Sequence, residues 1–171
     1  PMQSGHWKIE QISSDIADAA FQNGKKTITV QNTPKDPVRI RKLEQGTSAH
    51  YLKNVKFALY KVGQIEDGKP REGETPLISG STDLSGLLSL GGLEENTSYY
   101  LFETETLDGY ILLDSPVIIT TVGTNNIKAS MNGAPLSREK VKDSETRDVW
   151  EIVLYNSSGY ALPSTGGSGT L

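Results

Sequence analysis

The hydrophobic pattern of this chain has the period of a β-strand almost throughout, and this restricts the fold class more than any other feature. Short runs rich in Val, Ile, Thr and Tyr alternate between apolar and polar residues, and Gly, Pro, Asn or Asp bounds them. The runs predict strands at Val38–Lys42, Val55–Val62, Leu77–Ser81, Leu87–Leu90, Ser98–Glu103, Val117–Val122, Ile127–Met131 and Val149–Asn156. We therefore expect an all-β sandwich over residues 36–160.

Turn-forming residues predict the connections between these strands. The longest predicted turn region is Gly63–Gly73, and Asn132–Pro135 is a short one. The charged segment Lys140–Arg147 is interpreted as a solvated loop.

The first 34 residues have a different character. Ser13–Phe21 is the one segment with helical periodicity, and it lies between two short predicted strands, Trp7–Gln11 and Thr27–Gln31. A linker punctuated by proline follows at Asn32–Pro37. Because 34 residues are too few to build a core alone, residues 1–34 are interpreted as the C-terminal remnant of a preceding domain.

Composition argues against several function classes. The chain has no cysteine, so disulfides, thiolate metal sites and thiol nucleophiles are ruled out. The net charge is −4 and no basic cluster occurs, which disfavours nucleic acid as a partner. His6 and His50 lie in different segments without acidic partners at ligand spacing, so we expect neither a metal nor a cofactor. No apolar run is long enough for a membrane span, and no signal peptide is recognisable, so we expect a fragment of a longer precursor.

Three polar residues stand at the ends of otherwise apolar stripes. Every second residue of a strand shares a face, which gives the inward stripes Val38, Ile40, Lys42; Tyr99, Leu101, Glu103; and Trp150, Ile152, Leu154, Asn156. At a strand end each polar residue could simply be solvated, whereas burying any one of them alone would cost several kcal/mol. The coincidence of Lys42, Glu103 and Asn156 favours one shared buried site.

These residues also carry a family resemblance. Tyr99–Thr104, followed by Asp108–Tyr110, resembles the E box of Gram-positive pilins and of collagen-adhesin B-type (Cna B-type) repeats. Three further segments resemble the first, second and closing strands of that family, namely Val38–Lys42, Asn54–Tyr60 and Ile152–Asn156. The resemblance covers residues 36–167 and implies an immunoglobulin-like β-sandwich of the Cna B type, preceded by a remnant of a similar domain.

The resemblance implies an intramolecular isopeptide bond between Lys42 Nζ and the side-chain carbonyl of Asn156, with Glu103 as the catalyst. A dry site would let Lys42 lose its proton and become a nucleophile, while Glu103 polarises the carboxamide and carries the proton to departing ammonia. We expect Tyr99, Trp150 and Phe57 to exclude water. The alternative is a buried Lys42–Glu103 ion pair, with Asn156 satisfying the spare donors.

Two positions depart from the family pattern. Thr106 and Leu107 stand where the family usually has Ala-Pro, and Glu44 stands where an aspartate commonly follows the lysine. We expect neither departure to touch the three reacting groups. In the N-terminal remnant, Asn32 occupies the position of a reactive asparagine, but Gln11 stands at the acid position and the lysine strand is absent, so no bond is expected there.

The segment Leu162-Pro163-Ser164-Thr165-Gly166 resembles the sorting signal of sortases, the Gram-positive transpeptidases that attach surface proteins to the wall or to one another. Pro163 keeps the preceding backbone extended, and Gly166 leaves the scissile peptide unhindered. The alternative is a Ser/Gly-rich tail, residues 161–171, that matches by chance. The resemblance implies cleavage after Thr165 and transfer to a neighbouring pilin lysine or a peptidoglycan precursor, hence an extracellular, wall-anchored protein.

Together these features predict a structural stalk or shaft domain of a pilin or wall-anchored surface protein. Formation of the bond would be a single autocatalytic turnover, so the chain is not expected to be an enzyme. The rival interpretations are a ligand-binding adhesin domain and an accessory module of a secreted, wall-anchored enzyme. A host surface ligand would be bound through missing domains. An adhesin should expose an apolar patch, and none is evident in the sequence.

Overall fold

The computed structural model describes residues 37–123, 125–145 and 147–159, all of which belong to the compact unit Lys35–Leu171. The predicted elements of residues 1–34, the remnant asparagine Asn32 and the predicted sorting motif Leu162–Gly166 lie outside the described residues.

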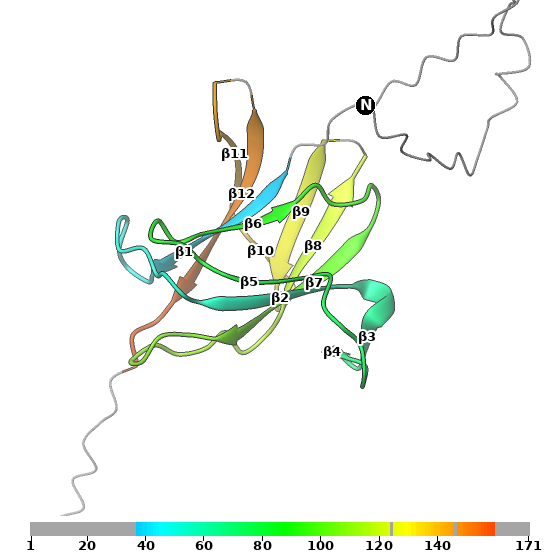
Figure 1. The fold of residues 1–171 in the computed structure, drawn as a ribbon, viewed down its shortest axis with the longest axis horizontal. Coiled ribbons are helices and arrows are strands. Elements are labelled where there is room, and N and C mark those ends of the chain that lie inside the picture. The colour runs from blue at the N-terminus through cyan, green and yellow to red at the C-terminus, as the bar shows by residue number, and fades with distance from the viewer. Residues whose placement is uncertain (1–36, 124, 146, 160–171) are drawn as a thin grey trace, which may run out of the picture. The chain divides into compact units, whose positions relative to one another are not determined.

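The described residues form strands joined by turns and a single 3₁₀ turn (Figure 1). The elements are β1 (Val38–Glu44), β2 (Lys56–Lys61), η2 (Val62–Gln64), β3 (Ile65–Glu66), β4 (Lys69–Pro70), β5 (Ile78–Ser81), β6 (Leu87–Gly91), β7 (Ser98–Glu105), β8 (Val117–Val122), β9 (Asn126–Met131), β10 (Ala134–Pro135), β11 (Arg138–Lys142) and β12 (Asp148–Asn156).

Two sheets make the sandwich. A four-stranded sheet has the order β11-β12-β1-β6, and a six-stranded sheet has the order β10-β9-β8-β7-β2-β5. Their inward faces enclose the core, because the longer strands of both sheets each have one apolar face that must be buried. The fully buried apolar side chains include Ile40, Phe57, Leu59, Leu101, Ile119, Ile152 and Leu154. The predicted all-β sandwich is therefore confirmed.

The first and last strands of the described domain lie side by side. Strand β1 pairs in parallel with β12, from Val38 opposite Trp150 to Glu44 opposite Asn156 (Figure 1). On the other side β1 pairs antiparallel with β6. Residues at the two ends of the domain sequence thus become neighbours in the centre of one sheet.

All eight predicted strands are present, with ends within two residues of the predicted ones. The short strands β3, β4 and β10 occupy the segments predicted as turns, Gly63–Gly73 and Asn132–Pro135. The prediction that Lys140–Arg147 is a loop is wrong at its start, because Lys140–Lys142 belong to β11. This strand pairs with β12 at the sheet edge and is mostly exposed, so it has no apolar face to give an alternating pattern.

Two glycines adopt the positive φ angles that the backbone requires in turns near the ends of β1 and β12. Gly86 has φ +69°, and a Cβ there would lie 2.5 Å from the carbonyl oxygen of Lys42. Its own carbonyl accepts a hydrogen bond of 2.8 Å from the Lys42 backbone N–H. Gly109 has φ +83°, in the turn after β7. A side chain at either position would be strained, and at Gly86 it would also displace β1.

Candidate functional site

The three residues predicted to form the site lie together inside the sandwich. Lys42 comes from β1, Glu103 from β7 and Asn156 from the end of β12. Their relative exposures are 0%, 6% and 1%. The side chains of Lys42 and Glu103 are both 0% exposed, so the small exposure of Glu103 belongs to its backbone.

The strand pairing explains this convergence. Lys42 lies opposite Leu154 in the parallel β1–β12 ladder, so Asn156 is two residues further along β12 and on the same inward face. Strand β7 belongs to the other sheet, where Glu103 lies opposite Phe57 of β2. Glu103 therefore reaches the pair from across the core.

Glu103 connects the other two residues. Its Oε2 lies 2.7 Å from Lys42 Nζ. Its Oε1 accepts a hydrogen bond of 2.6 Å from Asn156 Nδ2. The Lys42–Glu103 contact has the length of an ion pair but not the angles of a hydrogen bond, so Lys42 Nζ and Glu103 Oε2 have no hydrogen-bond partner among the described residues. Asn156 Oδ1 is likewise buried without a partner there.

Burial lowers the pKa of Lys42, and the nearby Glu103 carboxylate only partly opposes this effect. The Phe57 ring lies next to the amine, with its centroid 5.7 Å from Nζ. A lysine in such surroundings holds its proton weakly, and its neutral amine is a nucleophile.

The expectation that three aromatic residues line the site is correct only for Phe57. Trp150 lies opposite Val38, four residues before Lys42 in β1, and its indole N–H donates to the Asn125 carbonyl. The Tyr99 hydroxyl accepts a hydrogen bond from the Glu94 backbone N–H. Tyr99 precedes Glu103 in β7 and Trp150 precedes Asn156 in β12. Both rings are therefore displaced along the sheet from the three reacting side chains.

The structure adds a fourth polar residue that the sequence did not indicate. Thr106 Oγ1 accepts a second hydrogen bond from Asn156 Nδ2, at 2.7 Å. Thr106 follows β7 directly and is half-buried. The expectation that the departure from the family pattern at Thr106 does not touch the reacting groups is therefore wrong. Loop residues give no periodic signal from which this contact could be inferred.

An amine, a carboxamide and a carboxyl group thus meet where no solvent reaches their side chains. Such a set can exchange one amide for another, because the acid can take a proton from the amine and deliver one to the leaving nitrogen. Folding supplies the proximity that this reaction requires.

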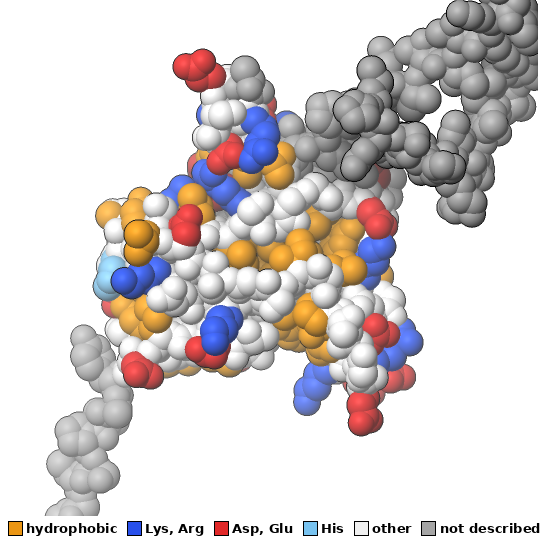
Figure 2. Space-filling view, viewed as in Figure 1, with side chains coloured by type: hydrophobic (Ala, Val, Ile, Leu, Met, Phe, Trp, Pro, Cys, Tyr) orange, Lys and Arg blue, Asp and Glu red, His pale blue; other side chains and the backbone are white. Residues whose placement is uncertain are grey.

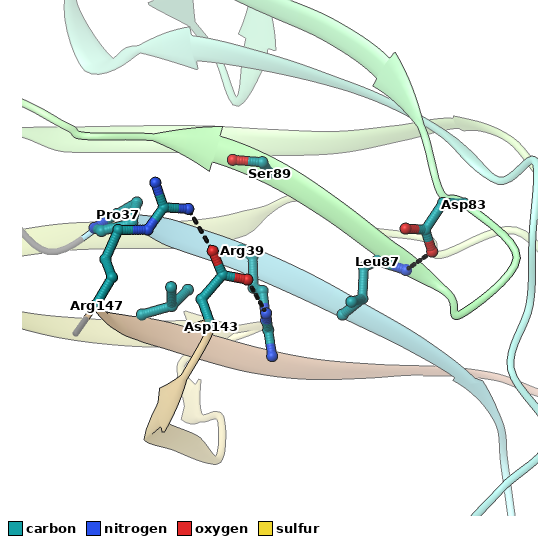
Figure 3. A pocket seen from close by; sticks show the side chains of 8 residues that line it. Pro37, Arg39, Asp83, Leu87, Ser89, Asp143 and Arg147 are labelled. Carbon is teal, nitrogen blue, oxygen red and sulfur yellow. Dashed lines mark hydrogen bonds and ion pairs between the residues drawn. The ribbon is translucent and has the colours of Figure 1, made fainter. Parts of the chain in front are cut away.

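A second polar cluster covers the outer face of the four-stranded sheet. Glu151 accepts hydrogen bonds from Arg39 Nε at 2.7 Å and from Arg41 Nε at 2.5 Å. Burial raises the pKa of Glu151, but these hydrogen bonds outweigh it and the pKa is lowered overall. The nearby cavity of about 190 Å³ is lined by Arg39, Asp143 and Arg147, and both arginines pair with Asp143 (Figure 3). A fourth charged residue of the lining, Asp83, accepts hydrogen bonds from the backbone N–H groups of Ser85 and Leu87. Each charged side chain of this cavity therefore has a partner.

Other surface features are modest. Figure 2 shows charged side chains scattered around small apolar areas on one face of the domain. A shallow cavity of about 250 Å³ is lined partly by Ile111, Leu112 and Tyr155, which are 58%, 42% and 46% exposed. This apolar patch could not be predicted from the hydrophobic pattern, because its residues come from a loop and from the end of β12.

His50 has an acidic partner after all, since its Nδ1 contacts the Glu44 carboxylate. No group of three potential metal ligands occurs in the described part of the chain. Within the same residues, no helix is long and apolar enough to cross a membrane.

Solved pilus proteins have a similar fold. The pilus adhesin SpaC of Lactobacillus rhamnosus GG, in its open conformation, matches with a TM-score of 0.51 and 19% identity, over 76% of this chain and 16% of the adhesin. A C-terminal fragment of SpaC matches with a TM-score of 0.52 and 18% identity, over 76% of this chain and 48% of the fragment. The pilus 2b backbone protein of group B streptococcus has 25% identity and a TM-score of 0.49, over 76% of this chain and 43% of that protein.

The SpaC matches establish the fold alone, and the chain spans less than half the length of these structures. No curated protein matches the chain. Residues 36–135, more than half of the chain, match the family described as SpaA, prealbumin-like fold domain. The chain therefore belongs to the SpaA prealbumin-like fold domain family.

Proposed function

We propose that this chain is a structural stalk domain of a Gram-positive pilin or wall-anchored surface protein. Its strands β1 and β12 are joined by an isopeptide bond between Lys42 and Asn156, and Glu103 catalyses formation of that bond. The observation that carries the proposal is the buried contact of all three side chains, with Glu103 between the amine and the carboxamide.

The reaction balances within the site. Lys42 gives one proton to Glu103 Oε2 and its neutral Nζ attacks Cγ of Asn156. The Nζ–Cγ bond forms, the Cγ–Nδ2 bond breaks, and a second proton from Nζ passes through Glu103 to Nδ2, which leaves as ammonia. Glu103 ends protonated and Lys42 Nζ becomes an amide nitrogen. The lowered pKa of Lys42 supports the first step, and exclusion of water disfavours hydrolysis.

The position of the bond suits a load-bearing element. Tension on a stalk enters through the segment before β1 and leaves through the segment after β12, and these are the strands that the bond would join. A covalent link between them would carry force that a hydrogen-bonded ladder would otherwise bear. The shared fold with pilus proteins and the family of the domain agree with this role.

Intact mass spectrometry of the purified, denatured chain tests the cross-link. We expect the wild type to be lighter than its sequence by the mass of one ammonia, and Glu103→Gln to retain the full mass expected from its own sequence. Glu105→Gln is the matched control, since Glu105 is an exposed glutamate of the same strand that pairs with Lys56. This control should lose ammonia as the wild type does. A wild type with its full mass would contradict the cross-link.

Attachment by sortase at Leu162–Gly166 is the second part of the proposal, and the five-residue motif supports it. With a glycine or lysine nucleophile present, purified sortase should cleave the chain after Thr165 and join the Thr165 carbonyl to the amine of the nucleophile. Thr165→Ala should stop the transfer, whereas Ser164→Ala should not, because the motif accepts any residue at that position. Equal transfer by both variants would argue against the assignment.

A further inference from the structure

The hydroxyl of Thr106 lies on the carboxamide that the proposed reaction consumes. We infer that Thr106 assists formation of the isopeptide bond by holding the Asn156 carboxamide before the reaction and by donating a hydrogen bond to its oxygen during the attack. This inference rests on the proposed function and adds a residue to its chemistry.

In the present arrangement the carboxamide nitrogen faces two acceptors. Asn156 Nδ2 donates to Glu103 Oε1 at 2.6 Å and to Thr106 Oγ1 at 2.7 Å. Both N–H bonds of the amide are thereby used, and this suits a Glu103 carboxylate that is ionised and paired with Lys42. The arrangement is that of the site before any proton moves.

During the attack by Lys42, the carboxamide oxygen of Asn156 needs a hydrogen-bond donor. Negative charge develops on Asn156 Oδ1 when Lys42 adds to Cγ, yet Oδ1 has no hydrogen-bond partner among the described residues. A half-turn of the carboxamide about its Cβ–Cγ bond exchanges the oxygen and the nitrogen. The oxygen then faces Glu103 Oε1 and Thr106 Oγ1. Once Lys42 has added, Oδ1, Nδ2 and Nζ are all bonded to the same tetrahedral carbon, so Glu103 stays within reach of Nδ2 and can deliver the proton with which ammonia leaves.

Both of these groups can donate in that arrangement. Glu103 becomes a donor once it is protonated by Lys42 and the proton lies on Oε1, the carboxyl oxygen that faces the carboxamide. A threonine hydroxyl both accepts and donates, so Thr106 keeps a partner before and after the half-turn. Thr106 therefore supplies the second donor to the developing oxyanion without becoming unsatisfied at either stage.

The loop that carries Thr106 is fixed to the segment that follows Asn156. The Ile111 backbone N–H donates to the Ser157 carbonyl at 3.0 Å, and the Gly159 N–H donates to the Gly109 carbonyl at 2.7 Å. These bonds hold the loop after β7 against the end of β12. The spacing between Thr106 and the carboxamide is thus set by the backbone rather than by the side chains alone.

The test follows bond formation in the full chain after refolding from denaturant. The starting material is insoluble, never-folded chain whose full mass has first been verified. Samples are quenched in acid at successive times, and intact mass gives the cross-linked fraction, while tryptophan fluorescence follows folding in the same reaction. Thr106→Val removes the hydroxyl and keeps the shape, and Thr106→Ser keeps the hydroxyl.

We expect Thr106→Val to fold at the wild-type rate but to form the bond about 100-fold more slowly, the lower end of the loss seen when one oxyanion donor is removed. Thr106→Ser should restore most of the rate. Bond formation by Thr106→Val at the wild-type rate would overturn the inference and leave the proposed function intact. Equal slowing of folding and bonding, or no rescue by serine, would also overturn it, because a packing role predicts those results. A wild type that never loses ammonia would refute the proposed function and this inference with it.

Discussion

The proposed cross-link predicts, quantitatively, how the domain should respond when its two ends are pulled apart. Strands β1 and β12 run parallel, so tension applied before β1 and after β12 loads their ladder in shear. With Lys42 and Asn156 joined, the load passes through the new amide. The chain between them then lies outside the path of the force.

The length of chain that unfolding can release follows from the positions of Lys42 and Asn156 in the sequence. The two residues are 114 positions apart (156 minus 42). An extended chain spans at most about 3.3–3.6 Å per residue, so unfolding without the bond releases up to about 400 Å. With the bond, extension is confined to the residues outside the loop.

Single-molecule force spectroscopy of the full chain between marker domains measures this length. The wild type should show no release on the order of 400 Å, at forces that unfold the markers. Glu103→Gln, which cannot carry the proton, should show that release once per molecule, and Glu105→Gln should behave like the wild type. A wild-type molecule that extends as far as Glu103→Gln would refute the reasoning.

Three further outcomes test the energetics. The double variant Lys42→Met/Glu103→Gln cannot form the proposed bond and leaves no unreacted charge in the core, so chemical denaturation should give a free energy of unfolding lower by about 5 kcal/mol, the entropy of closing this loop. Glu151→Gln should cost about 1.5–3 kcal/mol at neutral pH. Because the arginines lower the pKa of Glu151 despite its burial, that difference should vanish as the pH falls through the folded-state pKa, below the ordinary value of about 4.3. Gly86→Ala should cost about 2–4 kcal/mol through its positive φ and the clash with the Lys42 carbonyl, and an unchanged melting temperature would contradict this.

Much of the fold could be predicted from the sequence, because a buried strand leaves a period of two in its hydrophobic pattern. Val38, Ile40 and Lys42 show this directly, since all three are buried as the alternation indicates. The same period placed Glu103 and Asn156 on inward faces. It could not show whether the strands would bring the three side chains into contact, because that depends on strand order and register.

Features that leave no alternating hydrophobic pattern in the sequence could not be predicted. Strand β11 is an exposed edge strand of charged residues, so nothing in its pattern separates it from a loop. Glu151 is a buried carboxylate on the face of β12 that the alternation assigns to solvent, and Arg39 and Arg41 compensate its charge. Thr106 lies in a loop, and its contact with Asn156 arises from backbone bonds between distant segments. Trp150 is on the expected inward face of β12, but it lies opposite Val38 and not beside Lys42.

The most direct test of the central claim is to locate the bond itself. Protease digestion of the denatured wild type, followed by tandem mass spectrometry, should yield a branched peptide in which a fragment of β1 is joined to a fragment of β12. Fragment ions should place the junction at Lys42 and Asn156, with the loss of one ammonia. Recovery of the two fragments only as separate linear peptides, with Lys42 and Asn156 unmodified, would contradict the account.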